Sequence, residues 1–167
     1  MGLSAIFGMF AGVYHWFPKM YRRMMNKGLG YIHFWLTFIS AYGVFFPMHF
    51  TGLAGLPRRY YSNAEFPIFD ELQDINVIIS MFAILGGIAQ LIFIFNFFYS
   101  MWRGPKAPQN PWRSNTLEWT APVEHMHGNW PGEIPSVYRW PYDYSKPDHD
   151  EDFVPQNTPL KEGEVGH

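Results

Sequence analysis

Three stretches of the chain are strongly apolar and carry no charged side chain. They cover residues 1–18, 28–57 and 75–102, and polar segments separate them. A helix needs about 20 predominantly apolar residues to cross the hydrocarbon core of a bilayer. We therefore expect membrane-spanning helices over about residues 1–17, 29–47 and 75–102. The predicted fold class is an all-α integral membrane protein with three transmembrane helices.

The remainder of the chain, residues 103–167, has a different pattern. Most of the prolines and acidic residues of the sequence fall there, interleaved with Trp and Tyr. Proline interrupts long helices, and the aromatic content is too high for an ordinary disordered linker. These features predict an extended tail that lies on a partner surface, with a loose acidic stretch from about Asp148.

Basic residues predict how the chain is oriented in the membrane. The loop after the first span contains four of them, the segment after the third span contains three, and the loop between the second and third spans contains two. In the same order, they are Lys19, Arg22, Arg23 and Lys27; Arg103, Lys106 and Arg113; and Arg58 and Arg59. Because short cytoplasmic loops carry an excess of Lys and Arg, the first loop and the tail are predicted to be cytoplasmic. Arg58 and Arg59 would then lie on the outer, periplasmic side.

Composition excludes several classes of function. The chain has no cysteine, which rules out disulfides, thiolate nucleophiles and cysteine-based metal sites. Its net charge of −2 argues against a nucleic-acid partner, whose binding needs a basic face. No residue of the chain is predicted to be catalytic.

Histidines are the candidate metal ligands, and their spacing argues against such a site. His15, His33 and His49 lie near a predicted span or its end, but none has a second His or a carboxylate one helical turn away. His125 and His127 lie beside Glu124, a spacing that is common by chance. We therefore predict no metal site built from this chain alone.

Arg58 and Arg59 are a stronger candidate site. They follow 30 charge-free residues, in the segment TGLAGLPRRYY, whose glycines and proline predict a compact turn. Adjacent cations at a membrane edge need anions, and guanidinium groups suit carboxylates or phosphates in bidentate contact. The residues alone leave open a lipid headgroup, a structural salt bridge or a buried anionic ligand.

Three segments resemble a known family. YHWFPKMYRR, IHFWLTFISAYGVFFPMHFTGLAGLPRRYY and, more loosely, NPWRSNTLEW are similar to the last third of haem-copper oxidase subunit I, over roughly residues 1–120. The resemblance implies that the chain corresponds to the last helices of a twelve-helix bundle. It further implies that Arg58 and Arg59 contact the propionates of the two haems, with His49 and Tyr60 near haem. The histidines that bind the haem irons would precede Met1, and copper would be bound by the rest of the complex.

The resemblance also implies a function and partners. The chain would be the C-terminal portion of the catalytic subunit of a cytochrome c oxidase in the bacterial inner membrane, in a complex that reduces O2 to water and pumps protons. Its partners would be the N-terminal part of subunit I, other oxidase subunits, cytochrome c, membrane lipids and a larger respiratory supercomplex. Pro57 and His49 favour cytochrome c as the electron donor. The alternatives are a quinol oxidase of the same family, or a non-enzymatic membrane scaffold whose arginine pair holds anionic lipid.

Overall fold

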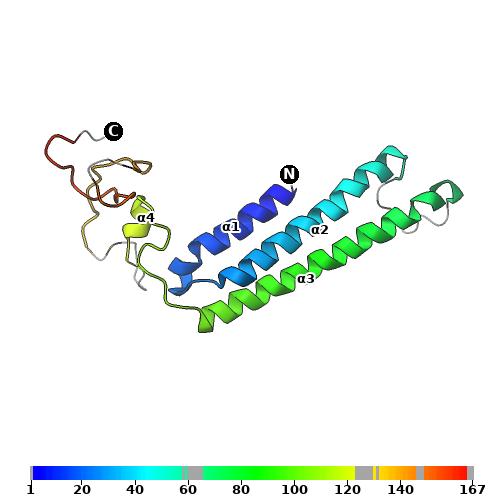
Figure 1. The fold of residues 1–167 in the computed structure, drawn as a ribbon, viewed down its shortest axis with the longest axis horizontal. Helices are drawn as coiled ribbons and strands as arrows, with labels where there is room; N and C mark the ends of the chain where they lie inside the picture. The colour runs from blue at the N-terminus through cyan, green and yellow to red at the C-terminus, as the bar shows by residue number, and fades with distance from the viewer. Residues whose placement is uncertain are drawn as a thin grey trace. The chain divides into compact units, whose positions relative to one another are not determined.

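The computed structural model describes residues 2–57, 59, 66–122, 130, 132–145 and 149–164. Within these ranges the chain is helical and contains no β-strand, only one isolated bridge. The elements are the helices α1 (Gly2–Tyr21), α2 (Lys27–Leu53), α3 (Gln73–Arg103) and α4 (Leu117–Thr120), and the 3-10 helix η1 (Pro67–Leu72) (Figure 1). The chain divides into two compact units, Met1–Gly12 with Met25–Gly104 and Val13–Met24 with Pro105–His167.

Two helical segments are long and apolar enough to cross a membrane, Lys27–Leu53 and Pro67–Arg103. They cover the second and third spans predicted from the sequence, which supports an all-α membrane protein. The helix α1 covers the first predicted span but is not one of these two segments, so a third crossing stays a prediction.

The helices α1 and α2 extend past the prolines at which the predicted spans end. α1 continues beyond Pro18 to Tyr21, and α2 continues beyond Pro47 to Leu53. A proline inside a helix removes one backbone hydrogen bond, but the remaining bonds of each turn persist. In an apolar environment the unsatisfied backbone of a broken helix would cost more than one missing bond.

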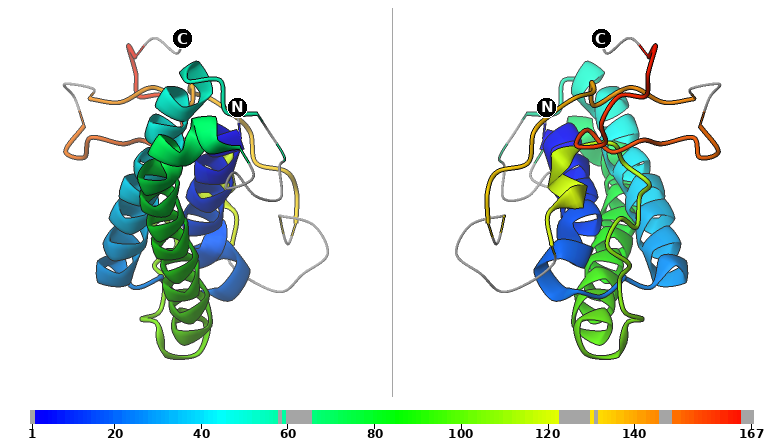
Figure 2. Two further views of the ribbon diagram at one scale, coloured as in Figure 1. Left: turned by 90° about the vertical axis from the view of Figure 1, so that its right-hand side faces the viewer. Right: turned by 90° about the vertical axis from the view of Figure 1, so that its left-hand side faces the viewer.

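In the first unit, α2 and α3 run antiparallel and lie side by side (Figures 1 and 2). Small residues permit their close approach. A Cβ atom added at Gly43 of α2 would overlap the ring of Phe82 of α3, and one added at Gly86 of α3 would lie 3.0 Å from Ser40 Oγ. Helices in membranes pack through such small residues because lipid supplies no hydrophobic drive for association.

The first half of α1 joins this pair through an aromatic cluster. The ring of Phe10 lies 4.7 Å from the ring of His33 in α2 and 4.7 Å from the ring of Phe93 in α3. His33 is 2% exposed, although it is polar. In contrast, many large apolar side chains of α2 and α3 are exposed, including Tyr42, Ile84 and Leu91. A water-soluble protein rarely exposes so many, whereas helices that face lipid or further helices do.

In the second unit, the tail folds on itself. The side chain of Asn115 is fully buried and accepts a hydrogen bond from the amide of Val154 at 2.7 Å. The side chain of Arg139 is also fully buried, and it pairs with Glu164. The sequence predicted a loose stretch from about Asp148. This was wrong for the described residues 149–164, which make specific contacts with residues 25 to 39 positions earlier.

Candidate functional site: the arginine turn after α2

The helix α2 ends in a defined hydrogen-bonded turn. The amide of Leu56 donates to the carbonyl of Thr51 at 3.0 Å, and the amide of Gly55 donates to the carbonyl of Gly52 at 3.1 Å. Gly55 has a φ of 88°, a left-handed conformation that favours glycine. This is the Schellman arrangement, which satisfies carbonyls at a helix end. The compact turn predicted from the glycines and Pro57 is therefore present, and it fixes where the following residues leave the helix.

Arg59 follows this turn, and it is the described member of the arginine pair. It is exposed and adopts a φ of 67°, the left-handed region that non-glycine residues seldom occupy. Within the described ranges, Arg59 forms no ion pair with an acidic residue of the chain. Arg58 and Tyr60, the neighbours with which it was predicted to act, lie outside the described residues.

His49 is exposed on the last turns of α2. Its Nδ1 atom lies 2.8 Å from the carbonyl oxygen of Phe45, one helical turn earlier. That contact holds the ring along the helix. No hydrogen bond in the described part of the chain joins His49 to Arg59, and their action at one site stays a prediction.

The other histidines lie in aromatic surroundings. His15 is stacked on Trp112, with ring centroids 5.6 Å apart, and meets Trp119 edge-on at 5.2 Å. His125 and His127 lie outside the described residues. Among the residues that are described, no group of three His, Cys, Asp or Glu side chains is arranged to hold a metal ion.

Comparison with known proteins decides the family. The family described as Cytochrome C and Quinol oxidase polypeptide I matches residues 1–85, which is half of the chain. The chain belongs to this family. The match includes the first two predicted spans, residues 52–59 (the arginine turn) and the beginning of α3.

Individual relatives extend the match into the tail. The chain is 46% identical to the alternative cytochrome c oxidase subunit 1 of Bradyrhizobium diazoefficiens, over 99% of this chain and 28% of that protein. It is 42% identical to cytochrome c oxidase subunit 1 of Synechocystis, over 84% of this chain and 24% of the relative. The corresponding protein of Thermostichus vulcanus is 37% identical, over 89% of this chain and 27% of its own length. The chain therefore spans about a quarter of the length of these relatives.

Membership of the cytochrome c and quinol oxidase polypeptide I family implies haem and copper in the assembled complex. The described residues of this chain suit the propionate groups of a haem but not its iron. The Arg59 guanidinium group, which follows the turn after a long apolar helix, suits a propionate carboxylate, because a charge-assisted hydrogen bond is strongest with a partner of opposite charge. The described histidines and carboxylates are not grouped to bind iron or copper.

The sequence did not predict that basic residues from two distant segments lie together. Arg22, Arg23 and Lys106 were used only to predict the orientation in the membrane. The structure places Arg23 directly opposite Lys106 in the isolated antiparallel bridge. The charges were visible in the sequence, but the pairing of two segments more than 80 residues apart was not.

Proposed function

We propose that the chain forms the C-terminal part of the catalytic subunit of a cytochrome c oxidase. In this proposal the assembled complex takes electrons from cytochrome c, reduces O2 to water and moves protons outward across the bacterial inner membrane. The observation that carries the proposal is the 46% identity to an oxidase subunit 1 along 99% of the chain. The two apolar helical segments and the exposed Arg59 that follows α2 are consistent with it.

The role of this chain would be to hold haem propionates and to complete the helix bundle. Arg58 and Arg59 would bind the propionates, and His49 and Tyr60 would lie near haem. Haem, when bound, supplies the iron through which electrons travel to O2. A propionate at the edge of an apolar site needs a cationic donor, and each charge-assisted hydrogen bond contributes about 1.5–3 kcal/mol.

The proposed topology has three membrane crossings, α1, α2 and α3. The loop between α1 and α2 and the tail lie in the cytoplasm, and the arginine turn lies on the periplasmic side. The excess of basic residues in the first loop and after α3 supports this orientation. The partners would be the rest of subunit I, the other oxidase subunits, cytochrome c, membrane lipids and a larger respiratory supercomplex.

An optical and kinetic experiment on the purified complex tests the proposal. The complex is isolated from membranes through a tag on this chain, and its spectrum is recorded in the oxidised and reduced states. We expect haem bands, and O2 consumption that reduced cytochrome c sustains and quinol does not. A preparation without haem would favour the membrane scaffold instead. Consumption sustained only by quinol would favour a quinol oxidase.

A further inference from the structure

Three aromatic side chains of the tail are exposed on a segment that buries its charges. Trp140 is 55% exposed, Tyr142 is 74% exposed, and Tyr138 is exposed as well. The charged residues beside them, Arg139 and Asp143, are buried. Burial of a charge costs free energy, and so does exposure of a large ring to water. We call Tyr138, Trp140 and Tyr142 the aromatic face, and a partner that covers it would stabilise the tail.

Hydrogen bonds hold the aromatic face in a fixed position. The amide of Tyr138 donates to the carbonyl of Gln156 at 2.9 Å. The buried guanidinium group of Arg139 donates to two backbone carbonyls and to a carboxylate. The rings of Trp140 and Tyr142 meet edge-on, with centroids 5.8 Å apart. A surface that is ordered before it binds loses little conformational entropy, and Trp and Tyr contribute most at protein interfaces.

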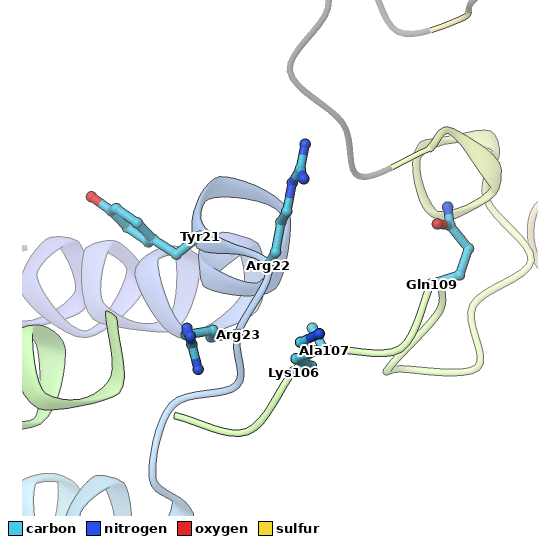
Figure 3. A pocket seen from close by; sticks show the side chains of 6 residues that line it. All are labelled: Tyr21, Arg22, Arg23, Lys106, Ala107 and Gln109. Atoms are coloured by element: carbon cyan, nitrogen blue, oxygen red, sulfur yellow. The ribbon is translucent and has the colours of Figure 1, made fainter. Parts of the chain in front are cut away.

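The tail already contacts one basic segment of the chain, the end of α1. The ammonium group of Lys19 lies 5.5 Å from the ring centroid of Trp119 and donates to the carbonyl of Glu118. The basic segment continues with Arg22 and Arg23, whose side chains point away from each other (Figure 3). The tail therefore contacts the Lys19 cation with an aromatic ring and an oxygen acceptor.

A cation within the tail is bound in a similar way. The guanidinium group of Arg113 lies 5.5 Å from the ring centroid of Phe153 and 3.2 Å from a carboxylate oxygen of Glu151. Cations are attracted to the face of an aromatic ring, and most strongly to that of Trp. A carboxylate beside the ring adds a charge-assisted hydrogen bond. An aromatic ring with an acceptor beside it is thus the arrangement by which this tail binds cations.

Exposed carboxylates accompany the aromatic face. Residues 105–167 contain ten acidic and five basic residues. Among the described acidic residues of the tail, those that are exposed are Glu133, Asp150, Glu151, Asp152 and Glu162. The cytoplasmic leaflet of a membrane carries anionic lipids, which repel such a surface. A basic protein surface, in contrast, complements it.

We propose that the aromatic face binds a Lys- or Arg-rich cytoplasmic loop of the part of subunit I that this chain does not contain. This inference rests on the proposed function, which places the tail in the cytoplasm beside the rest of subunit I. The chain spans about a quarter of the length of its relatives, so most of the loops of the subunit lie outside it. Short cytoplasmic loops carry an excess of Lys and Arg. A cation of such a loop would lie over Trp140 or Tyr142 as Lys19 lies over Trp119.

Site-specific photo-crosslinking in the purified complex tests the proposal. The photoreactive amino acid p-benzoylphenylalanine takes the place of Tyr142, and crosslinked peptides are identified by mass spectrometry. We expect crosslinks to a Lys- or Arg-rich cytoplasmic loop of the rest of subunit I. The proposal is overturned if crosslinks form only to lipid, to another subunit or to this chain, or if none form.

Variants of Trp140 separate cation binding from plain burial of apolar surface. Trp140→Leu removes the ring but keeps an apolar side chain, so the crosslink yield at position 142 should fall about fivefold. Trp140→Phe keeps a ring and should retain most of the yield. Ile134→Ala is the control for loss of an exposed apolar side chain from the same segment. An unchanged yield in Trp140→Leu, or an equal loss in Ile134→Ala, would contradict the proposal.

Salt dependence and haem spectra complete the test. The crosslink yield should fall as the salt concentration rises, because salt screens interactions between exposed charges. A yield that does not depend on salt would contradict the role of charge. The same preparation is examined for haem bands and for O2 consumption with cytochrome c. If both are present without the expected crosslinks, the partner of the aromatic face is wrong and the proposed function stands. If haem is absent, the proposed function is wrong, and so is the partner that depends on it.

Discussion

The backbone amide of Asn26 donates a hydrogen bond to the hydroxyl of Ser100, 3.0 Å away and 74 residues later in the chain. The hydroxyl of Ser100 in turn donates to Asn96 Oδ1 at 2.9 Å, and the Nδ2 atom of Asn96 donates to the carbonyl of Asn26 at 3.1 Å. Asn96 and Ser100 are fully buried. The N-cap of α2 is thus tied to the last turns of α3 by a closed ring of hydrogen bonds, in which each member satisfies another.

Removal of the central hydroxyl should open this ring. Ser100→Ala removes the acceptor of the Asn26 amide, in a partly buried hydrogen bond, and the donor to Oδ1 of the buried Asn96, which we expect to cost about 1–3 kcal/mol. We expect a lower unfolding temperature of the purified complex, followed by circular dichroism. Ser80→Ala is the control on the same helix, because its hydroxyl is exposed and donates only to the carbonyl of Asn76. Equal effects of the two variants would mean that the ring contributes nothing.

Close packing of α2 on α3 depends on Gly43. Gly43→Ala places a methyl group into the ring of Phe82, so the helices must separate or the ring must move. Overpacking of this kind costs about 1–3 kcal/mol. We expect lower thermal stability and reduced assembly into the complex, with partial recovery in the double variant Gly43→Ala with Phe82→Leu. Gly87→Ala is the control, since a Cβ atom there meets nothing within 4 Å. Lack of recovery in the double variant would rule out the steric explanation.

Arg59 should influence the haem potential. Arg59→Met removes the charge that would compensate a propionate near low dielectric, which favours protonation of that propionate. We expect haem to remain bound, because in the proposed function its iron ligands belong to the rest of subunit I, while its midpoint potential shifts and proton pumping falls. Arg59→Lys keeps the charge but loses the planar fork, so it should shift the potential less.

Redox titration of the purified complex measures this effect, and the same experiment applies to Arg58. Arg113→Met removes an exposed cation of the tail and is the control for loss of charge alone. If both Arg58→Met and Arg59→Met keep the haem midpoint potentials of the parent complex, the proposed propionate contact is wrong. Altered lipid content or stability in these variants, without a change in potential, would favour the lipid-anchor alternative.

The fold of the tail should be sensitive to acid through Glu164. Hydrogen bonds from the buried Arg139 guanidinium hold the pKa of Glu164 well below its usual value of 4.5. A carboxylate whose pKa is lowered by folding contributes its full stabilisation at a pH above its unfolded-state pKa. The contribution is lost as the pH falls toward the folded-state pKa. Asp143 lies 4.0 Å from the Arg139 guanidinium and His149 lies 3.4 Å from Glu164, so both belong to the same charge group.

We therefore expect the tail of the intact complex to become more susceptible to pepsin as the pH falls below about 4.5. Glu164→Gln should raise susceptibility at neutral pH, measured with a neutral protease, and should flatten this pH dependence. Glu151→Gln is the control, because its partner Arg113 is largely exposed and such pairs contribute little. An unchanged pH profile in Glu164→Gln would show that the Arg139 pair does not stabilise the tail.

Trp119 should anchor the first part of the tail. It is 1% exposed, lies edge-on to His15 and carries the Lys19 ammonium group 5.5 Å from its ring centroid. Trp119→Ala removes one of the largest buried side chains and should cost about 3–5 kcal/mol. We expect rapid proteolytic cleavage near residues 105–122. Trp140→Ala is the control, since Trp140 is 55% exposed. Parental cleavage rates in Trp119→Ala would show that the tail is held elsewhere.

The tryptophans of the tail show which of its contacts could be predicted from the sequence alone. Their content predicted that the tail lies on a partner surface, which stays a prediction, whereas within the chain Trp119 and Trp112 contact the second half of α1. The sequence did not predict that the tail would be its own partner. Buried Asn115 and Arg139 hold residues 149–164 through contacts that neither proline content nor charge reveals. A polar residue is normally predicted to be exposed, because its burial depends on hydrogen-bond partners from distant parts of the chain.

The amino-acid sequence by itself determined the apolar helices, the turn at Gly55 and the family. Helices and turns arise from bonds between residues three to five positions apart, and membrane crossing depends on runs of apolar side chains, so both are local properties. The tertiary structure decided which residues meet across long separations. The contact of Gly43 with Phe82, the ring through Asn26 and Ser100, and the bridge between Arg23 and Lys106 all depend on the path of the chain between them. That path follows from packing of whole helices, which no single segment specifies.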